Sequence, residues 1–239
     1  MAIVAKRFWK TARVVQTPDG FSVYLDKHQL KTPLKTAVIV PTKGFAEKVA
    51  GEWRAVDGKI KKHLMPFNRI AEAALDAAET EYSEIVGNLA GYGETDLLCY
   101  RADAPVELIA RQAKHWDPLL TWAARDLAAP LRVTHGIIAV EQDRLSIQKL
   151  RSCIEQFDLF QLTAFYDLVK LSGSLIIGLA VARHHIDAKT GWRLSRLDDD
   201  WQIEQWGVDE DAQILAQSKQ SDFENADIAL SLFTNQSNS

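Results

Sequence analysis

The sequence lacks a long hydrophobic segment, which argues against a membrane or secreted protein. No uncharged run is longer than the twelve residues of 171–182, whereas a membrane-spanning helix needs about 20 apolar residues. The N-terminus is charged from Lys6 onward, too early for the apolar stretch of about 7–15 residues that a secretory signal requires. We therefore expect a soluble cytoplasmic protein without membrane insertion.

Cysteines and catalytic motifs are also scarce. The two cysteines, Cys99 and Cys153, stand apart without metal-ligand spacing, which is typical of reduced core thiols. None of the six histidines forms an HExxH pair, and neither a GxSxG nor a GxGxxG motif occurs. The stretch from Gly51 to Lys59 has the wrong spacing for a phosphate-binding loop, and Ile60 follows it where Ser or Thr would bind magnesium. The sequence thus predicts no enzymatic activity, cofactor, metal or small-molecule substrate.

The charges are distributed unevenly along the chain. Of its 239 residues, 47% are hydrophobic and 25% charged, which suits one large or two small domains without disulfides. The net charge of −4 combines +8 from residues 1–62 (13 basic, 5 acidic) with −12 from residues 63–239 (15 basic, 27 acidic). Basic residues near Phe8 and Trp9 leave single-stranded nucleic-acid binding open as an alternative function. They are spread evenly through predicted strands and helix, however, so we expect no nucleic-acid partner.

The first forty residues have the pattern of short strands joined by tight turns. Residues 21–26 alternate between apolar and polar, the period of a half-buried strand. The turn residues Thr17-Pro18-Asp19-Gly20 connect this strand to residues 13–16, and residues 37–40 form a further strand. Strands joined by such short connections pair antiparallel.

From Pro41 onward the apolar residues recur with helical spacing. A polar residue or Pro near the start of several segments and a Gly near the end of others mark the helix boundaries. The predicted helices are 42–56, 66–90, a helix from about 103 to 127 that Pro118 kinks or splits, 143–157, 159–169, 174–182, 192–205 and 209–219. We predict an α+β fold: a small N-terminal antiparallel β/helix domain, residues 1–92, and a larger all-helical C-terminal domain, residues 93–239.

An acidic segment with two tryptophans is the most informative stretch of the chain. Residues 198–211 contain seven carboxylates and no basic residue, with Trp201 and Trp206 between them. Three interpretations are open: a solvated acidic helix face, a protein-binding surface, or a metal-dependent hydrolase site. Adjacent carboxylates on a helix point about 100° apart, which disfavours the metal site.

Several motifs in a fixed order resemble those of the assembly chaperones that act on the α subunit of the ATP synthase catalytic head in mitochondria and α-proteobacteria. Together they span residues 7–207. The similar stretches are Arg7-Phe8-Trp9-Lys10, Tyr24-Leu25-Asp26, Leu30-Lys31-Thr32-Pro33, Val40-Pro41, Glu52-Trp53, Leu98-Cys99-Tyr100-Arg101, Trp116-Asp117-Pro118 before Trp122, and Ser195-Arg196-Leu197 followed by acids, Gln202 and Trp206-Gly207. The chain departs from eukaryotic members after Gly207, where it has Val208-Asp209-Glu210-Asp211.

The resemblance implies a two-part, non-catalytic chaperone. Such a protein holds the newly made α subunit and covers the surface that later packs against the β subunit. The chain has no organelle-targeting extension, which favours a bacterial cytoplasmic member. We expect the partner to contact Asp198, Asp199, Asp200, Trp201, Glu204, Trp206, Gly207 and Asp209. The alternatives are nucleic-acid binding by the N-terminal domain and metal-dependent hydrolysis at residues 198–211.

Overall fold

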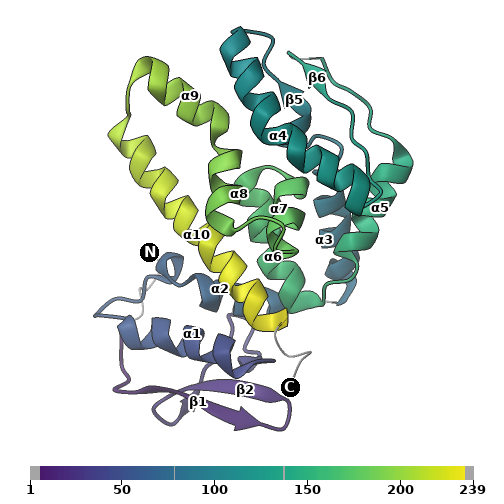
Figure 1. The fold of residues 1–239 in the computed structure, drawn as a ribbon. Coiled ribbons are helices and arrows are strands. Elements are labelled where there is room, and N and C mark those ends of the chain that lie inside the picture. The colour runs from purple at the N-terminus through teal and green to yellow at the C-terminus, as the bar shows by residue number, and fades with distance from the viewer. Residues whose placement is uncertain (1–5, 78, 137, 235–239) are drawn as a thin grey trace.

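The computed structural model describes residues 6–77, 79–136 and 138–234, and it places a small sheet unit at one end of a helical body (Figure 1). β1 (Ala12–Thr17) pairs antiparallel with β2 (Gly20–Leu25) across the predicted turn. β3 (His28–Gln29) and β4 (Ile39–Val40) pair antiparallel with two different stretches of β2. Gly20 permits the close approach of β4, because a Cβ there would lie 2.6 Å from the Val40 carbonyl oxygen. The predicted antiparallel arrangement is confirmed.

One amphipathic helix covers the sheet. α1 (Lys43–Ala55) begins where predicted, because the Thr42 hydroxyl accepts a hydrogen bond from the Phe45 amide. Its apolar face, which includes Phe45 and Trp53, is buried in the core. The Trp53 indole donates to the side-chain oxygen of Asn68 at 2.8 Å. The Glu52 carboxylate accepts a hydrogen bond from the backbone N–H of Asn68, also at 2.8 Å. These bonds fix α1 to the first helix of the body.

The helical body is built around α6 (Leu159–Ser172) and the almost wholly buried α7 (Leu175–Ala182). The two helices pack closely, since a Cβ on Gly178 would lie 2.7 Å from the Val169 side chain. Two strands of two residues each also pair in parallel within the helical body. The remaining elements are η1 (Lys62–Leu64), α2 (Pro66–Asp76), α3 (Glu79–Gly91), η2 (Leu97–Cys99), β5 (Tyr100–Arg101), α4 (Val106–Asp126), β6 (Thr134–His135), α5 (Arg144–Ile154), α8 (Ala188–Ser195), α9 (Leu197–Trp206) and α10 (Glu210–Thr234).

Two of the predicted helices are each divided in the structure, and the split considered at Pro118 does not occur. The segment 66–90 forms two helices, because the backbone is extended at Ala77. The segment 192–205 is divided between α8 and α9 at Arg196. Pro118 lies inside α4 without ending it, since the buried side chains around it, including Trp116 and Trp122, hold the helix against the body.

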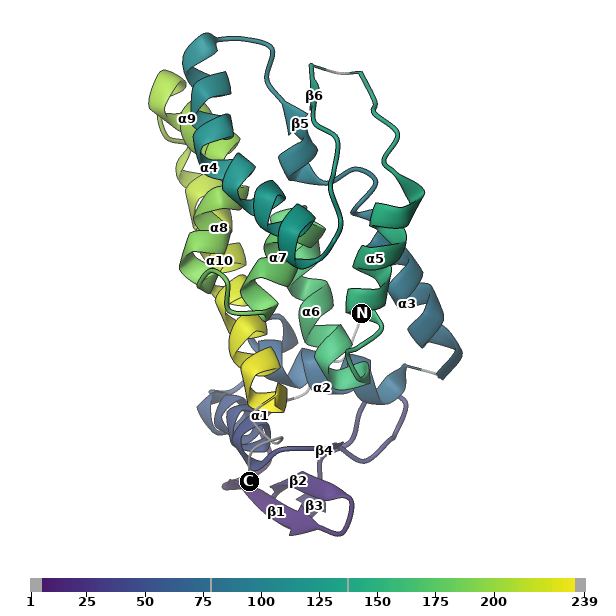
Figure 2. The ribbon, with the colours of Figure 1, turned by 45° about the vertical axis from the view of Figure 1, so that its right-hand side comes forward.

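The last helix is also much longer than the predicted 209–219. α10 runs from beside α9 to the sheet unit (Figures 1 and 2). Its second half buries Phe223, Leu230 and Phe233 against α6, α2 and α1. The second half of α10 therefore packs on both the sheet unit and the helical body. The boundary near residue 92 stays a prediction.

Candidate functional site

Most of the predicted partner-binding residues lie on one poorly buried helix. Leu197 is the one buried residue of α9, which projects from the body and turns back into α10 (Figure 1). Gly207 ends α9 with a φ of +93°, a conformation that favours glycine. The Asp209 carboxylate begins α10 by accepting hydrogen bonds from the amides of Asp211 and Ala212, at 3.0 and 3.1 Å. We call residues 197–219 the α9–α10 hairpin; Gly207 and Asp209 shape its turn.

The carboxylates of α9 differ in their surroundings. Glu204 forms a two-point ion pair with Arg111 of α4, which lowers the Glu204 pKa. Asp199 binds Arg196 at 2.6 Å. Asp198 accepts a hydrogen bond from the Gln112 side chain at 2.8 Å, but its partial burial raises its pKa. The acids thus attach α9 to its neighbours as well as giving it charge.

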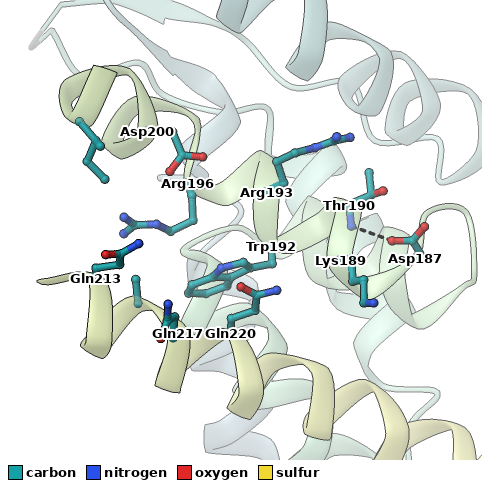
Figure 3. Close-up of a pocket in the computed structure, with 12 residues that line it drawn as sticks. Asp187, Lys189, Thr190, Trp192, Arg193, Arg196, Asp200, Gln213, Gln217 and Gln220 are labelled. Atoms are coloured by element: carbon teal, nitrogen blue, oxygen red, sulfur yellow. Dashed lines mark hydrogen bonds between the residues drawn. The ribbon is translucent and has the colours of Figure 1, made fainter. Parts of the chain in front are cut away.

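Asp200 is the exception on α9. Its carboxylate makes no hydrogen bond to any residue that the structure describes. Partial burial raises the pKa of this carboxyl, and the positive charge of Arg196 offsets part of that effect. It faces the hollow between α8, α9 and α10 (Figure 3). Asp200 is therefore the α9 acid with the freest carboxylate oxygens.

The two tryptophans of the segment also have different roles. Trp201 lies below the Arg111 guanidinium, 5.7 Å from carbon to ring centre, and is half-buried. It lines a hollow of about 630 Å³ between α9, α4 and β5, together with Tyr100 and Leu108. Trp206 is 80% exposed. Trp201 thus packs α9 on the body, whereas Trp206 is free to meet a partner.

Exposed apolar side chains occur on both sides of the hairpin turn. Trp206, Val208, Ile214 and Leu215 are all more than half exposed. We call these four the tip patch. Trp206 and Leu215 also line a hollow of about 340 Å³ between α9 and α10. Exposed apolar groups beside unpaired charge are typical of contact surfaces for other proteins.

Three members of the tip patch, Val208, Ile214 and Leu215, are not among the partner-binding residues predicted from the sequence. A signal was present, because Ile214 and Leu215 are apolar neighbours in a segment whose other residues are mostly polar. Two adjacent helical positions point about 100° apart, so both can be buried only if the helix is covered on a wide face. The first half of α10 has no such cover.

The structure also bears on the two alternative sites, a metal site and a basic nucleic-acid surface. Within the described ranges no three His, Cys, Asp or Glu side chains lie where they could hold a metal ion. In the same ranges no helix has the length and apolar character to cross a membrane.

In the basic N-terminal unit, Arg7 donates to the carbonyl oxygens of Val56 and Trp9, at 2.7 and 3.1 Å. Its guanidinium therefore joins segments of the sheet unit.

The chain is similar to known proteins over both the sheet unit and the helical body. A family model described as ATP12 chaperone protein matches residues 6–124. The crystal structure of Atp12 from Paracoccus denitrificans is 44% identical, with a TM-score of 0.88, over 95% of this chain and 98% of that one. A structure from Agrobacterium tumefaciens is 30% identical, with a TM-score of 0.90, over 98% of this chain and 87% of that one. The mitochondrial atp12 protein of Schizosaccharomyces pombe is 27% identical over 220 residues, 87% of this chain and 75% of that protein.

Proposed function

The chain belongs to the ATP12 chaperone family, and we propose that it binds the unassembled α subunit of the F-type ATP synthase and shields its subunit interface until assembly. We further propose that it acts in the bacterial cytoplasm and catalyses no reaction. The observation that carries the proposal is the tip patch, four exposed apolar side chains on a projecting hairpin with a net negative charge.

The physical requirement on such a chaperone is modest. A subunit that will be part of a ring exposes, before assembly, apolar surface that would otherwise drive aggregation. A protein that covers this surface reversibly protects the subunit, and release requires only that the next subunit competes for the same surface. Neither step needs a nucleotide or a catalytic group.

We propose that the eight residues predicted from the sequence act in two ways. Trp206 and Asp200 contact the partner directly, since Trp206 is exposed and the Asp200 carboxylate has no hydrogen-bond partner among the described residues. The others set the position of the hairpin: Asp198, Asp199, Trp201 and Glu204 through contacts to neighbouring side chains, and Gly207 and Asp209 through the turn.

The test compares two matched triple variants. The first replaces three tip-patch residues, Val208→Ser, Ile214→Ser and Leu215→Ser; the second replaces three exposed leucines elsewhere, Leu34→Ser, Leu64→Ser and Leu145→Ser. The wild type and the second variant should retain purified α subunit on a column and suppress its aggregation, and the tip variant should do neither. Failure of the wild type to bind the α subunit would overturn the proposal. Equal binding by both variants would place the contact outside the tip patch.

A further inference from the structure

A groove of about 670 Å³ lies between α8, α9 and the first half of α10 (Figure 3). Its floor is the indole of Trp192, which packs on Phe223 with 5.9 Å between ring centres and is itself only 7% exposed. Ile203 from α9 and Ala216 from α10 add apolar surface to its walls. The groove thus offers apolar contact along its base, and its volume is within the range of binding clefts, about 300–1,000 Å³.

Three glutamines form one wall of this groove. Gln213, Gln217 and Gln220 are spaced four and three residues apart, so they lie on the same face of α10. In the described part of the chain, the side-chain amides of Gln213 and Gln217 make no hydrogen bond, and Gln220 uses one N–H to bind Glu224 at 3.0 Å. This wall presents unused donors and acceptors beside the apolar floor.

A primary amide carries the same C=O and N–H groups as a peptide bond, so it can both donate to and accept from a backbone. At about 1.5 Å per helical residue, the seven steps from Gln213 to Gln220 extend over about 10 Å. An extended chain directs equivalent peptide groups to one side about every 6.6–6.8 Å. Two of the three amides can therefore meet successive peptide groups of one extended segment.

The charge at the α8 end of the groove adds a preference. Lys189 and Arg193 line this end, and neither is in an ion pair with any described residue. The nearby Asp187 carboxylate is engaged at the start of α8, where it accepts the Thr190 amide hydrogen at 2.7 Å. The two cations outnumber this one carboxylate and so favour an acidic side chain on the occupant.

We propose that this groove captures an extended segment of the unassembled α subunit through its backbone. In this arrangement the glutamine amides bind alternate peptide groups, the indole of Trp192 receives an apolar side chain, and Lys189 and Arg193 attract an acidic one. The inference rests on the proposed function and adds how the partner is held. Capture through the backbone tolerates differences in partner sequence, because every residue but proline offers the same two groups.

The test removes the amides while keeping apolar contact. Methionine has nearly the length and helix propensity of glutamine but no amide, so the variant Gln213→Met/Gln217→Met/Gln220→Met isolates the proposed bonds. Its control, Ser218→Ala/Ser221→Ala/Asn225→Ala, alters polar residues of the same helix that do not line the groove. Binding of the purified α subunit should weaken at least tenfold in the methionine variant and stay unchanged in the control, with equal melting temperatures.

Equal or tighter binding by the methionine variant would overturn the inference and leave the proposed function standing. Absence of α-subunit binding by the wild type would overturn both. A second measurement uses overlapping synthetic peptides that tile the α subunit, of which the tightest binder is N-methylated at alternate peptide bonds. Methylation in one register should weaken binding about tenfold and in the other should not; equal effects in the two registers would contradict backbone capture.

Discussion

The Arg111 guanidinium of α4 donates two hydrogen bonds, of 2.6 and 2.7 Å, to the Glu204 carboxylate of α9. The same guanidinium lies over the Trp201 ring. Apart from these contacts and the hydrogen bond from Gln112 to Asp198, little holds α9 on α4, because Leu197 is its one buried residue. The attachment of α9 to α4 therefore depends mainly on Arg111, with Gln112 as the second contact.

The first prediction is that reversing either charge of this pair weakens α-subunit binding and that reversing both restores it. Arg111→Glu and Glu204→Arg should each reduce affinity about tenfold, equivalent to ~1.4 kcal/mol. Each should lower the free energy of unfolding by less than about 1 kcal/mol, since the pair is partly exposed. Calorimetric titration and urea denaturation of the two single variants and the double variant measure both quantities. A double variant no better than the singles would show that Glu204 contacts the partner itself.

The second prediction is that two tryptophans that differ in burial differ in their effect: the exposed Trp206 matters for binding and the buried Trp53 for stability. Trp206→Ala should change the free energy of unfolding by no more than about 0.5 kcal/mol while weakening α-subunit binding, because this indole is 80% exposed. Trp53→Ala should instead cost about 3–5 kcal/mol, since the ring is buried and its nitrogen donates to Asn68. Phe8→Ala, another exposed aromatic, is the control for binding. Loss of binding in Phe8→Ala as large as in Trp206→Ala would argue against a specific role for the tip.

The sequence predicts the local features of this molecule better than the distant ones. The cap at Thr42 and the start of α5 after Asp143 depend on neighbours within a few residues, and both are confirmed. The predicted alternation of β2 is confirmed at Val23 and Leu25 but is wrong at Ser22, which is also buried because its hydroxyl donates to the Val38 carbonyl oxygen inside the sheet. The break at Arg196 and the full length of α10 depend on packing between segments far apart in the chain.

The candidate site shows the same limit. The acidic composition of residues 198–211 can be read from the sequence, but the arginine that holds Glu204 is 93 positions away. Trp201 and Trp206 are alike in the sequence, and only the fold makes one a packing residue and the other an exposed one. Burial depends on which surfaces meet, and periodicity gives only the face that is available for burial.

The third prediction concerns the contact between α1 and the last turns of α10. The rings of Phe45 in α1 and Phe233 in α10 lie 4.4 Å apart between centres, and both are buried. Phe233→Ala should lower the free energy of unfolding by about 3–5 kcal/mol. Because the sheet unit and the helical body share this contact, we expect the wild-type protein to unfold in a single transition, followed alike by tryptophan fluorescence and circular dichroism. Two separated transitions would instead support independent domains divided near residue 92.

The fourth prediction is a pH dependence of stability that originates at Asp96. This carboxylate is completely buried, where it accepts hydrogen bonds from the amides of Leu98 and Ile176 and from the Ser174 hydroxyl, at 3.0, 3.0 and 2.7 Å. Burial raises its pKa from 3.8 to about 6 even so. The folded chain keeps this proton at pH values where the unfolded chain has already released it. The stability that the group contributes is therefore complete below about pH 4 and is lost as the pH rises through about 6.

The measurement is the free energy of unfolding in urea at a series of pH values. At roughly 1.4 kcal/mol for each pH unit between the two pKa values, the wild type should lose about 3 kcal/mol from this group between pH 4 and 6. Asp96→Asn cannot ionise, so it should make the curve less steep in that window whatever its absolute stability, and the slope that remains there comes in part from Glu52. Glu52→Gln should instead flatten the curve up to about pH 7, because burial raises the Glu52 pKa to about 7. If the slope of Asp96→Asn between pH 4 and 6 matches that of the wild type, Asp96 is ionised in the folded protein throughout the window, and its three hydrogen bonds outweigh its burial.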